Sequence, residues 1–165
     1  RVRAKLAAAR ESGADATVLY PTGELTTEQR KELTAAFKEA CGPRGASVVF
    51  DPVGGLYSEP AFRAIGWGGR YLVIGFATGI ASLPLNLPLL KGAGILGVYW
   101  GESVERDPAG HQAAVAELVE LYGKGLVRPR VHGVWPLENG GEALAFLASR
   151  KATGKLVVRV RDPGE

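Results

Sequence analysis

Hydrophobic residues fall into short β-type runs that alternate with longer stretches of helical periodicity along almost the whole chain. Such alternation is typical of β-α-β units, in which helices connect the parallel strands of one sheet. The β-branched run 47–51 has the composition of a strand buried on both faces. The predicted strands are 17–20, 47–51, 70–76, 95–100 and 155–160, with a proline-broken extended segment at 127–135. The pattern therefore predicts an α/β fold built on a parallel sheet.

The predicted helices carry start and stop signals. An alanine-rich helix over 2–12 ends before Gly13, which suits a left-handed C-cap. Thr26 and Gln29 have the spacing of a capping box and predict the start of a second helix, which Gly42-Pro43 ends. Further helices are predicted at 56–65, 108–122 and 137–150, and residues 161–165 are expected to form a frayed tail.

Composition and charge exclude several classes of protein. The net charge of +3 comes from 20 basic and 17 acidic residues spread along 165 positions, so no nucleic-acid partner is predicted. No apolar run reaches the ~18–20 residues that a membrane span requires. A single cysteine excludes a disulfide framework and a multi-cysteine zinc site, and it suits a reducing compartment. We therefore expect a cytoplasmic protein without a membrane span.

Glycine-rich residues follow two neighbouring predicted strands. Gly54 and Gly55 come after strand 47–51, and Gly75, Phe76 and Ala77 lie at the end of strand 70–76. Glycine also punctuates turns in any α/β protein, so neither pair alone indicates a ligand. Side by side at the carboxyl ends of parallel strands, however, they predict the crevice in which open α/β sheets bind dinucleotides.

Several further motifs occur in register with these glycines. They are 51–55 (DPVGG), 66–77 (GWGGRYLVIGFA), 84–86 (PLN), 89–92 (LLKG), 97–101 (GVYWG), 136–138 (PLE) and 150–155 (RKATGK). Together they resemble the cofactor domain of zinc-independent NADPH:quinone oxidoreductases, a family of the medium-chain dehydrogenase/reductase superfamily. The resemblance covers essentially the entire chain, but no glycine-rich dinucleotide fingerprint precedes these strands. We therefore expect the chain to be the carboxyl-terminal part of a longer enzyme.

The resemblance implies a set of cofactor-binding residues. Gly75, Phe76 and Ala77 would line the nicotinamide–ribose pocket together with the segment Tyr99, Trp100 and Gly101. Gly54 and Gly55 would lie on the adenosine side. Because an aromatic residue at a strand end is commonly part of a core, Trp100 is also explained by simple packing.

Two residues near the amino terminus bear on the choice of cofactor. In the family, a lysine at the position of Lys5 binds the adenosine 2′-phosphate, and Tyr20 corresponds to a residue beside the adenine. This assignment favours NADPH over NADH. A solvated lysine on a helix surface explains Lys5 equally well.

Two residues near the carboxyl terminus complete the expected cofactor set. The resemblance suggests a cofactor contact for Arg150 and Lys155, although cations near a helix end are also favoured by the helix dipole. We assign no catalytic side chain and no metal ligand. Hydride transfer from a nicotinamide is the chemistry of the cofactor, and the protein orients the reactants.

The resemblance also predicts the organisation of the fold. It implies an incomplete Rossmann-like, doubly wound parallel sheet without its first two strands, in which segment 17–20 is the third. Residues 1–126 would belong to the dinucleotide-binding domain, and residues 127–165 would return toward a catalytic domain outside the chain. We expect low stability and weak cofactor affinity for the isolated 165 residues.

The predicted function is hydride transfer from NADPH to a quinone or another conjugated carbonyl. The full-length protein is expected to be a homodimer, with edge strand 95–100 extending the sheet between two copies. Two alternatives remain open: an enoyl reductase of fatty-acid or polyketide type, and a non-catalytic Rossmann-like module with a structural or partner-binding role.

Overall fold

The computed structural model describes residues 2–21 and 23–161. The chain divides into two compact units, one formed by Asp15–Glu105 and the other by Arg1–Ala14 with Arg106–Glu165. The expected frayed tail lies outside the described residues except for Arg161. The expected domain boundary after residue 126 stays a prediction.

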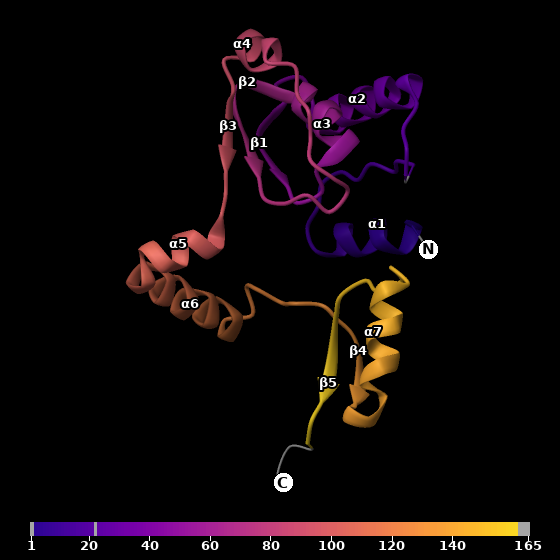
Figure 1. The fold of residues 1–165 in the computed structure, drawn as a ribbon, viewed down its shortest axis with the longest axis vertical. Coiled ribbons are helices and arrows are strands. Elements are labelled where there is room, and N and C mark those ends of the chain that lie inside the picture. Colours follow the sequence, from indigo (N-terminus) through magenta and orange to yellow (C-terminus); the bar gives the residue numbers. More distant parts are fainter. Residues whose placement is uncertain (1, 22, 162–165) are drawn as a thin grey trace. The chain divides into compact units, whose positions relative to one another are not determined.

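A three-stranded parallel sheet forms the centre of the unit 15–105 (Figure 1). Its strands are β1 (Ala46–Asp51), β2 (Ile65–Val73) and β3 (Gly94–Gly97), in the order β1-β2-β3. The strands are connected as in β-α-β units. Along the chain, α3 (Ser58–Arg63) follows β1 and precedes β2, and α4 (Asn86–Lys91) follows β2 and precedes β3. Helix α2 (Thr27–Cys41) precedes β1, and the 3-10 turn η1 (Gly55–Tyr57) precedes α3. The parallel α/β fold predicted from the sequence is confirmed.

The predicted start of α2 is confirmed in detail. The hydroxyl of Thr26 accepts a hydrogen bond from the backbone N–H of Gln29 at 3.2 Å, and Gln29 Oε1 accepts one from Thr26 N–H at 2.9 Å. These reciprocal bonds satisfy two of the donors that a helix start leaves unpaired. The helix ends at Cys41, after which Gly42 has a φ of 71° that suits glycine.

Two small hydrophobic clusters hold this unit together. One lies between the sheet and the helices α3 and α4, and it consists of Phe62, Ile65, Tyr71 and Leu87. The other joins α2 to the start of α3 and consists of Leu25, Leu33 and Tyr57. Both clusters depend on helices packed on the side of the sheet that Val49 and Tyr71 face.

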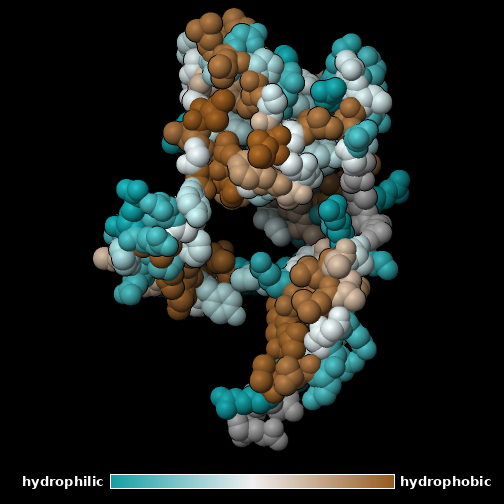
Figure 2. All heavy atoms as spheres, viewed as in Figure 1, coloured by the Kyte–Doolittle hydropathy of each residue, from teal (hydrophilic) through white to brown (hydrophobic). Residues whose placement is uncertain are grey.

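The other face of the sheet is open. Phe50 on β1 is 67% exposed and Val48 is 42% exposed, and Leu96 on β3, which pairs with the same residue Leu72 as Phe50 does, is also exposed. The prediction that strand 47–51 is buried on both faces is therefore wrong for the unit 15–105, because no described helix of this unit covers the second face. Figure 2 shows hydrophobic side chains reaching the surface of this unit around β3.

Three predicted strand boundaries need correction. Segment 17–20 forms no strand, since within the described residues no neighbouring strand pairs with it. Strand β2 runs from Ile65 to Val73 instead of 70–76, because the glycine-rich stretch 66–69 continues the ladder through a register irregularity opposite Ala46–Val48 and the ladder stops at the pair Asp51–Val73. Strand β3 ends at Gly97, and Trp100 begins the helix α5 (Trp100–Arg106), which the sequence pattern did not predict.

The second unit contains helices and a separate pair of parallel strands. Its elements are α1 (Val2–Glu11), α6 (Pro108–Gly123), β4 (Val131–Pro136), the 3-10 turn η2 (Leu137–Asn139), α7 (Gly140–Ala148) and β5 (Lys155–Arg159). Helix α6 is capped by Asp107, whose carboxylate accepts from Gly110 N–H at 2.9 Å. An ion pair of 2.8 Å between Arg130 Nη1 and Glu11 Oε2 links the segment before β4 to α1. None of the helices in the described ranges has the length and apolar character that crossing a bilayer requires.

Candidate functional site

The loops after β1 and β2 meet at one edge of the sheet. Because Asp51, Val73 and Gly97 are paired neighbours in the ladder, all three strands end at the same level. The backbone N–H groups of Ile74 and Gly75 both donate to the carbonyl of Asp51, at 3.0 and 3.3 Å. The structure thus brings together five predicted cofactor-binding residues: Gly54, Gly55, Gly75, Phe76 and Ala77.

These two loops pack backbone against backbone. Thr78 N–H donates to the carbonyl of Val53 at 2.8 Å, and the Thr78 hydroxyl lies 3.1 Å from the carbonyls of Val53 and Gly54. A Cβ at Gly54, where φ is +73°, would lie 2.5 Å from the carbonyl oxygen of Gly79. Glycine at position 54 is therefore required by the close approach of the loops and by its left-handed backbone. Its contact with a cofactor stays a prediction.

Open space at this edge lies beside other glycines. A Cβ at Gly79 or Gly97 would have no neighbour within 4 Å. Three aromatic residues follow the ends of these strands in the sequence: Phe76 after β2, and Tyr99 and Trp100 after β3. All three side chains are more than half exposed, and that of Trp100 is 68% exposed. The explanation of Trp100 as a core residue is therefore wrong in this chain. The edge offers flat apolar rings beside glycines without a Cβ, an arrangement that suits a planar ligand.

Asp51 organises the turn that follows β1. Its Oδ1 accepts hydrogen bonds from the backbone N–H groups of Val53 at 2.8 Å and Gly54 at 2.9 Å. Its Oδ2 accepts from the hydroxyl of Ser58 at 2.8 Å and from the hydroxyl of Tyr71. Ser58 and Tyr71 are almost completely buried. The carboxylate thus joins two N–H groups of the loop 52–55 to the hydroxyls of α3 and β2, and its role in this chain is structural.

The surroundings of Asp51 keep it ionised. Burial alone raises the pKa of the carboxyl group, but the hydrogen bonds from Tyr71, Gly54, Ser58 and Val53 outweigh burial and hold the pKa below its ordinary value. Burial and the neighbouring carboxylate raise the pKa of Tyr71 far above the usual range, so its hydroxyl stays a donor. Both directions favour a charge-assisted hydrogen bond between an ionised acid and a neutral phenol.

We expect this network to make the stability of the chain sensitive to acid. A folded-state pKa below the unfolded value of about 4 stabilises the fold at higher pH, and that contribution is lost as the pH falls through the folded pKa. Urea unfolding of the wild-type chain and of Asp51→Asn, measured between pH 3 and 7, should show a shallower acid limb for the variant. Identical slopes for both proteins would show that Asp51 does not contribute to acid unfolding.

Tyr20 lies close to the loop after β1, although it is not in a strand. Its ring centroid is 5.1 Å from that of Tyr57 and 6.3 Å from that of Phe37. The Tyr57 hydroxyl donates to the carbonyl of Pro21 at 3.1 Å, which holds the segment carrying Tyr20 near η1. These rings line an apolar cavity of about 310 Å³ beside β1. Tyr20 and the loop containing Gly54 therefore belong to one region of the unit.

Three other predicted residues belong to the second unit. Lys5 is exposed on α1, Arg150 follows α7 with a φ of 56°, and Lys155 begins β5. Lys155 N–H donates to the carbonyl of Arg130 at 2.7 Å and so serves the β4–β5 pair. These three side chains belong to a different unit from the strand-end loops, so their contacts with a cofactor stay predictions.

The structure adds residues that sequence reasoning missed. Thr78 holds the loop after β2 to the loop after β1, and Ser58 and Tyr71 hold Asp51. No local pattern marks them, since each acts on a residue at least seven positions away. In the described part of the chain, no group of three or more His, Cys, Asp or Glu residues could hold a metal ion.

Comparison with known proteins agrees with this geometry. The family model described as "Zinc-binding dehydrogenase" matches residues 12–158. Quinone oxidoreductase-like protein 2 of Rattus norvegicus is 34% identical over 154 residues, covering 93% of this chain and 42% of the relative. A solved NAD-dependent alcohol dehydrogenase is 28% identical with a TM-score of 0.72, covering 96% of this chain and 42% of that one. The mycobacterial protein Rv1454c, solved in complex with NADPH, shares the fold at 19% identity with a TM-score of 0.70 (92% of this chain, 44% of that one).

These matches define the class of the protein. The chain has a parallel sheet with glycine-rich loops at its carboxyl edge, and most of its length aligns with the family model and with a solved dehydrogenase. It is therefore part of the Rossmann-like domain of a medium-chain dehydrogenase/reductase. More narrowly, the chain belongs to the zinc-binding dehydrogenase family. It spans less than half the length of the curated relative and of the solved structures named above.

Proposed function

We propose that this chain forms the later part of the cofactor domain of an NADPH-dependent oxidoreductase that reduces a quinone or another conjugated carbonyl. The observation that carries the proposal is the family match over residues 12–158, which includes the strand-end loops that meet at one edge of the sheet. The 34% identity to a quinone oxidoreductase-like protein supports the substrate class.

We assign the nicotinamide and the adenosine of the cofactor to different residues at the carboxyl edge of the sheet. Gly75, Phe76 and Ala77, with Tyr99, Trp100 and Gly101, would hold the nicotinamide side, where exposed rings and open glycines leave room for a flat group. Gly54 and Gly55 would lie toward the adenosine, near Tyr20 and its cavity. The bound nicotinamide supplies the hydride. The chain contributes orientation and exclusion of water.

We further propose NADPH as the cofactor. Lys5 would pair with the adenosine 2′-phosphate as a point charge, and Arg150 and Lys155 would supply further positive charge. The full-length protein would be a cytoplasmic homodimer. The free edge of β3, which lies at the end of the order β1-β2-β3, would extend the sheet between copies.

The first test is the coding sequence upstream of Arg1. The proposal expects a strand followed by a glycine-rich turn, because that turn places backbone N–H groups on the cofactor pyrophosphate. It also expects a preceding domain that would build the carbonyl pocket. A start codon directly before Arg1 would instead favour the non-catalytic module.

The second test measures cofactor preference in the full-length protein. Lys5→Ala should raise the KM for NADPH by about tenfold, the loss of roughly one charge-assisted hydrogen bond, and leave the KM for NADH unchanged. Lys124→Ala is the charge-matched control, because Lys124 is the C-cap residue of α6 and lies outside the proposed cofactor set. Assays with a quinone and with an enoyl thioester as acceptors would separate the quinone reductase from the enoyl reductase. Unchanged NADPH kinetics in Lys5→Ala would remove Lys5 from the site.

A further inference from the structure

A basic pocket lies at the opposite end of the sheet from the strand-end loops. It has a volume of about 1000 Å³ and is lined by residues of α2, α3, α4 and the loop before β1. Ile65, the first residue of β2, forms part of its wall, so the pocket sits at the amino ends of the strands. The proposed cofactor residues take no part in it.

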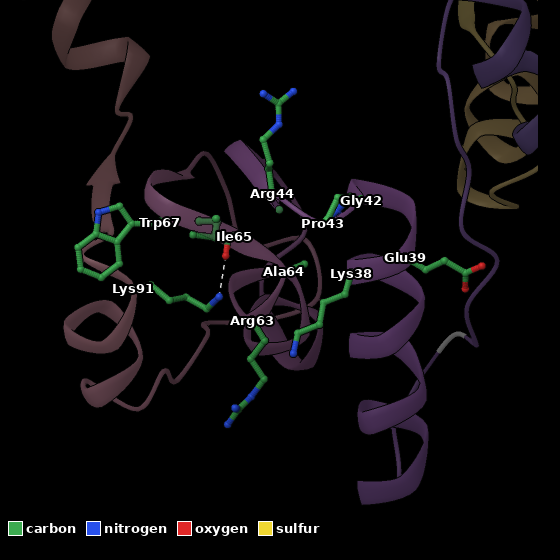
Figure 3. Close-up of a pocket in the computed structure, with 12 residues that line it drawn as sticks. Lys38, Glu39, Gly42, Pro43, Arg44, Arg63, Ala64, Ile65, Trp67 and Lys91 are labelled. Atoms are coloured by element: carbon green, nitrogen blue, oxygen red, sulfur yellow. Dashed lines mark hydrogen bonds between the residues drawn. The ribbon is translucent and has the colours of Figure 1, made fainter.

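Three cations from three different helices extend toward this pocket. Figure 3 shows Lys38 of α2, Arg63 of α3 and Lys91 of α4 reaching into the space below Ile65, whereas Arg44 and Glu39 point away from it. Lys91 Nζ donates to the carbonyl of Ile65 at 2.6 Å, which fixes the end of its long side chain. The three charges are thus brought together by the fold although they lie far apart in the sequence.

The positive charge in the pocket is not balanced. Glu59 accepts hydrogen bonds from Arg63 Nε at 2.9 Å and Nη2 at 2.6 Å, and this pair is the one ion pair found among the three cations in the described residues. Burial, followed by the charges of Lys38 and Arg63, lowers the pKa of Lys91. Two positive charges therefore remain without a carboxylate partner.

A neighbouring groove adds two further cations, Arg30 and Lys31, of which Lys31 pairs with Glu28 at 3.3 Å. Lys38 and Arg63 also line this second cavity, together with Arg30 and Thr34 of α2. The Nε of Arg30 is buried and has no hydrogen-bond partner in the described part of the chain. A buried donor without an acceptor costs about 1–3 kcal/mol, and Arg30 places a further positive charge beside Lys38 and Arg63.

Trp67 gives the pocket an apolar wall. Its side chain is 83% exposed, and its ring lies against Gly92, where an added Cβ would be 3.2 Å from the ring. Glycine at 92 therefore leaves room for the indole at the end of α4. Figure 3 shows this exposed ring on the Lys91 side of the pocket, where it suits the less polar body of a ligand that has an anionic head.

We propose that this basic pocket binds an organic phosphate carrying two negative charges, with the phosphate between Lys38, Arg63 and Lys91 and the rest of the molecule against Trp67. Lysine is well suited to phosphate as a point charge, and arginine offers donors in a fixed plane. Two unbalanced positive charges match one phosphate dianion. The cations converge from three helices instead of forming a stripe, which favours a compact ligand over a nucleic-acid strand.

Titration of the 165-residue chain with ribose 5-phosphate tests the proposal. Binding is detected by tryptophan fluorescence and by calorimetry. We expect saturable binding that weakens with added salt, a weaker response to inorganic phosphate, and no fluorescence change in Trp67→Phe. Lys38→Ala should weaken binding by about tenfold, the effect of one charge-assisted hydrogen bond, and Lys38→Glu should abolish it. Thermal unfolding of each variant, compared with wild type, identifies any loss that comes from misfolding.

The controls separate this pocket from general electrostatics and from the cofactor edge. Lys151→Ala removes one exposed positive charge outside the pocket and should leave the affinity unchanged. NADH, which carries no phosphate monoester, should not compete with ribose 5-phosphate, so the result is independent of the proposed cofactor edge. Equal weakening by Lys38→Ala and Lys151→Ala would overturn the proposal. So would competition by NADH, the absence of binding at millimolar concentration, or binding of a single-stranded oligonucleotide alone.

Discussion

Replacing Asp51 with alanine is expected to destabilise the chain by about 3–5 kcal/mol. The substitution removes the acceptor of four hydrogen bonds, two of which come from the nearly fully buried hydroxyls of Ser58 and Tyr71. Each buried donor left without a partner costs roughly 1–3 kcal/mol, and partial relaxation reduces the sum. Urea unfolding followed by tryptophan fluorescence would show a lower midpoint, or no folded baseline if the chain is marginally stable.

A matched substitution separates this network from the general loss of a carboxylate. Asp107 is an exposed aspartate that caps α6 through Gly110 N–H, so Asp107→Ala should cost only about 1 kcal/mol. Asp51→Asn retains one acceptor oxygen and should lie between the two alanine variants. A similar cost for Asp51→Ala and Asp107→Ala would show that the Asp51 network contributes no more than a surface cap.

Local signals in the sequence predicted most of the elements of the fold. The capping box at Thr26 and Gln29 defined the start of α2, and the β-branched runs identified β1 and β2, because these features act within one element. Segment 17–20 has strand composition but forms no strand. A strand needs a neighbour to pair with, and composition does not reveal whether that neighbour is present.

The candidate site was predicted only in part for a similar reason. The glycines at 54, 55 and 75 were found as turn signals, and the structure adds that Gly54 is needed where two loops touch. In the sequence, nothing distinguishes Tyr71 and Ser58 from other strand and helix residues. Only the folded chain brings their hydroxyls to Asp51. The basic pocket has no sequence signature, because Lys38, Arg63 and Lys91 come from three separate helices.

The two faces of the sheet should respond very differently to the loss of an aromatic ring. Phe62 is completely buried between the sheet, α3 and α4, and Phe62→Ala should cost about 3–5 kcal/mol through lost burial and the cavity left behind. Phe50 lies on the open face and is 67% exposed, so Phe50→Ala should cost less than about 1 kcal/mol. Both variants can be compared by urea unfolding of the 165-residue chain.

The same pair of variants also tests whether the natural protein covers the open face. Parallel sheets occur with both faces covered, yet Phe50, Val48 and Leu96 are exposed in this chain. If the protein is longer and its additional helices pack on this face, Phe50→Ala should become as costly as Phe62→Ala in the full-length form. A cost that stays below about 1 kcal/mol in both forms would contradict the expectation that additional helices of a longer protein cover this face. The Phe62→Ala cost should change little between the two forms, since its neighbours are all present in the described chain.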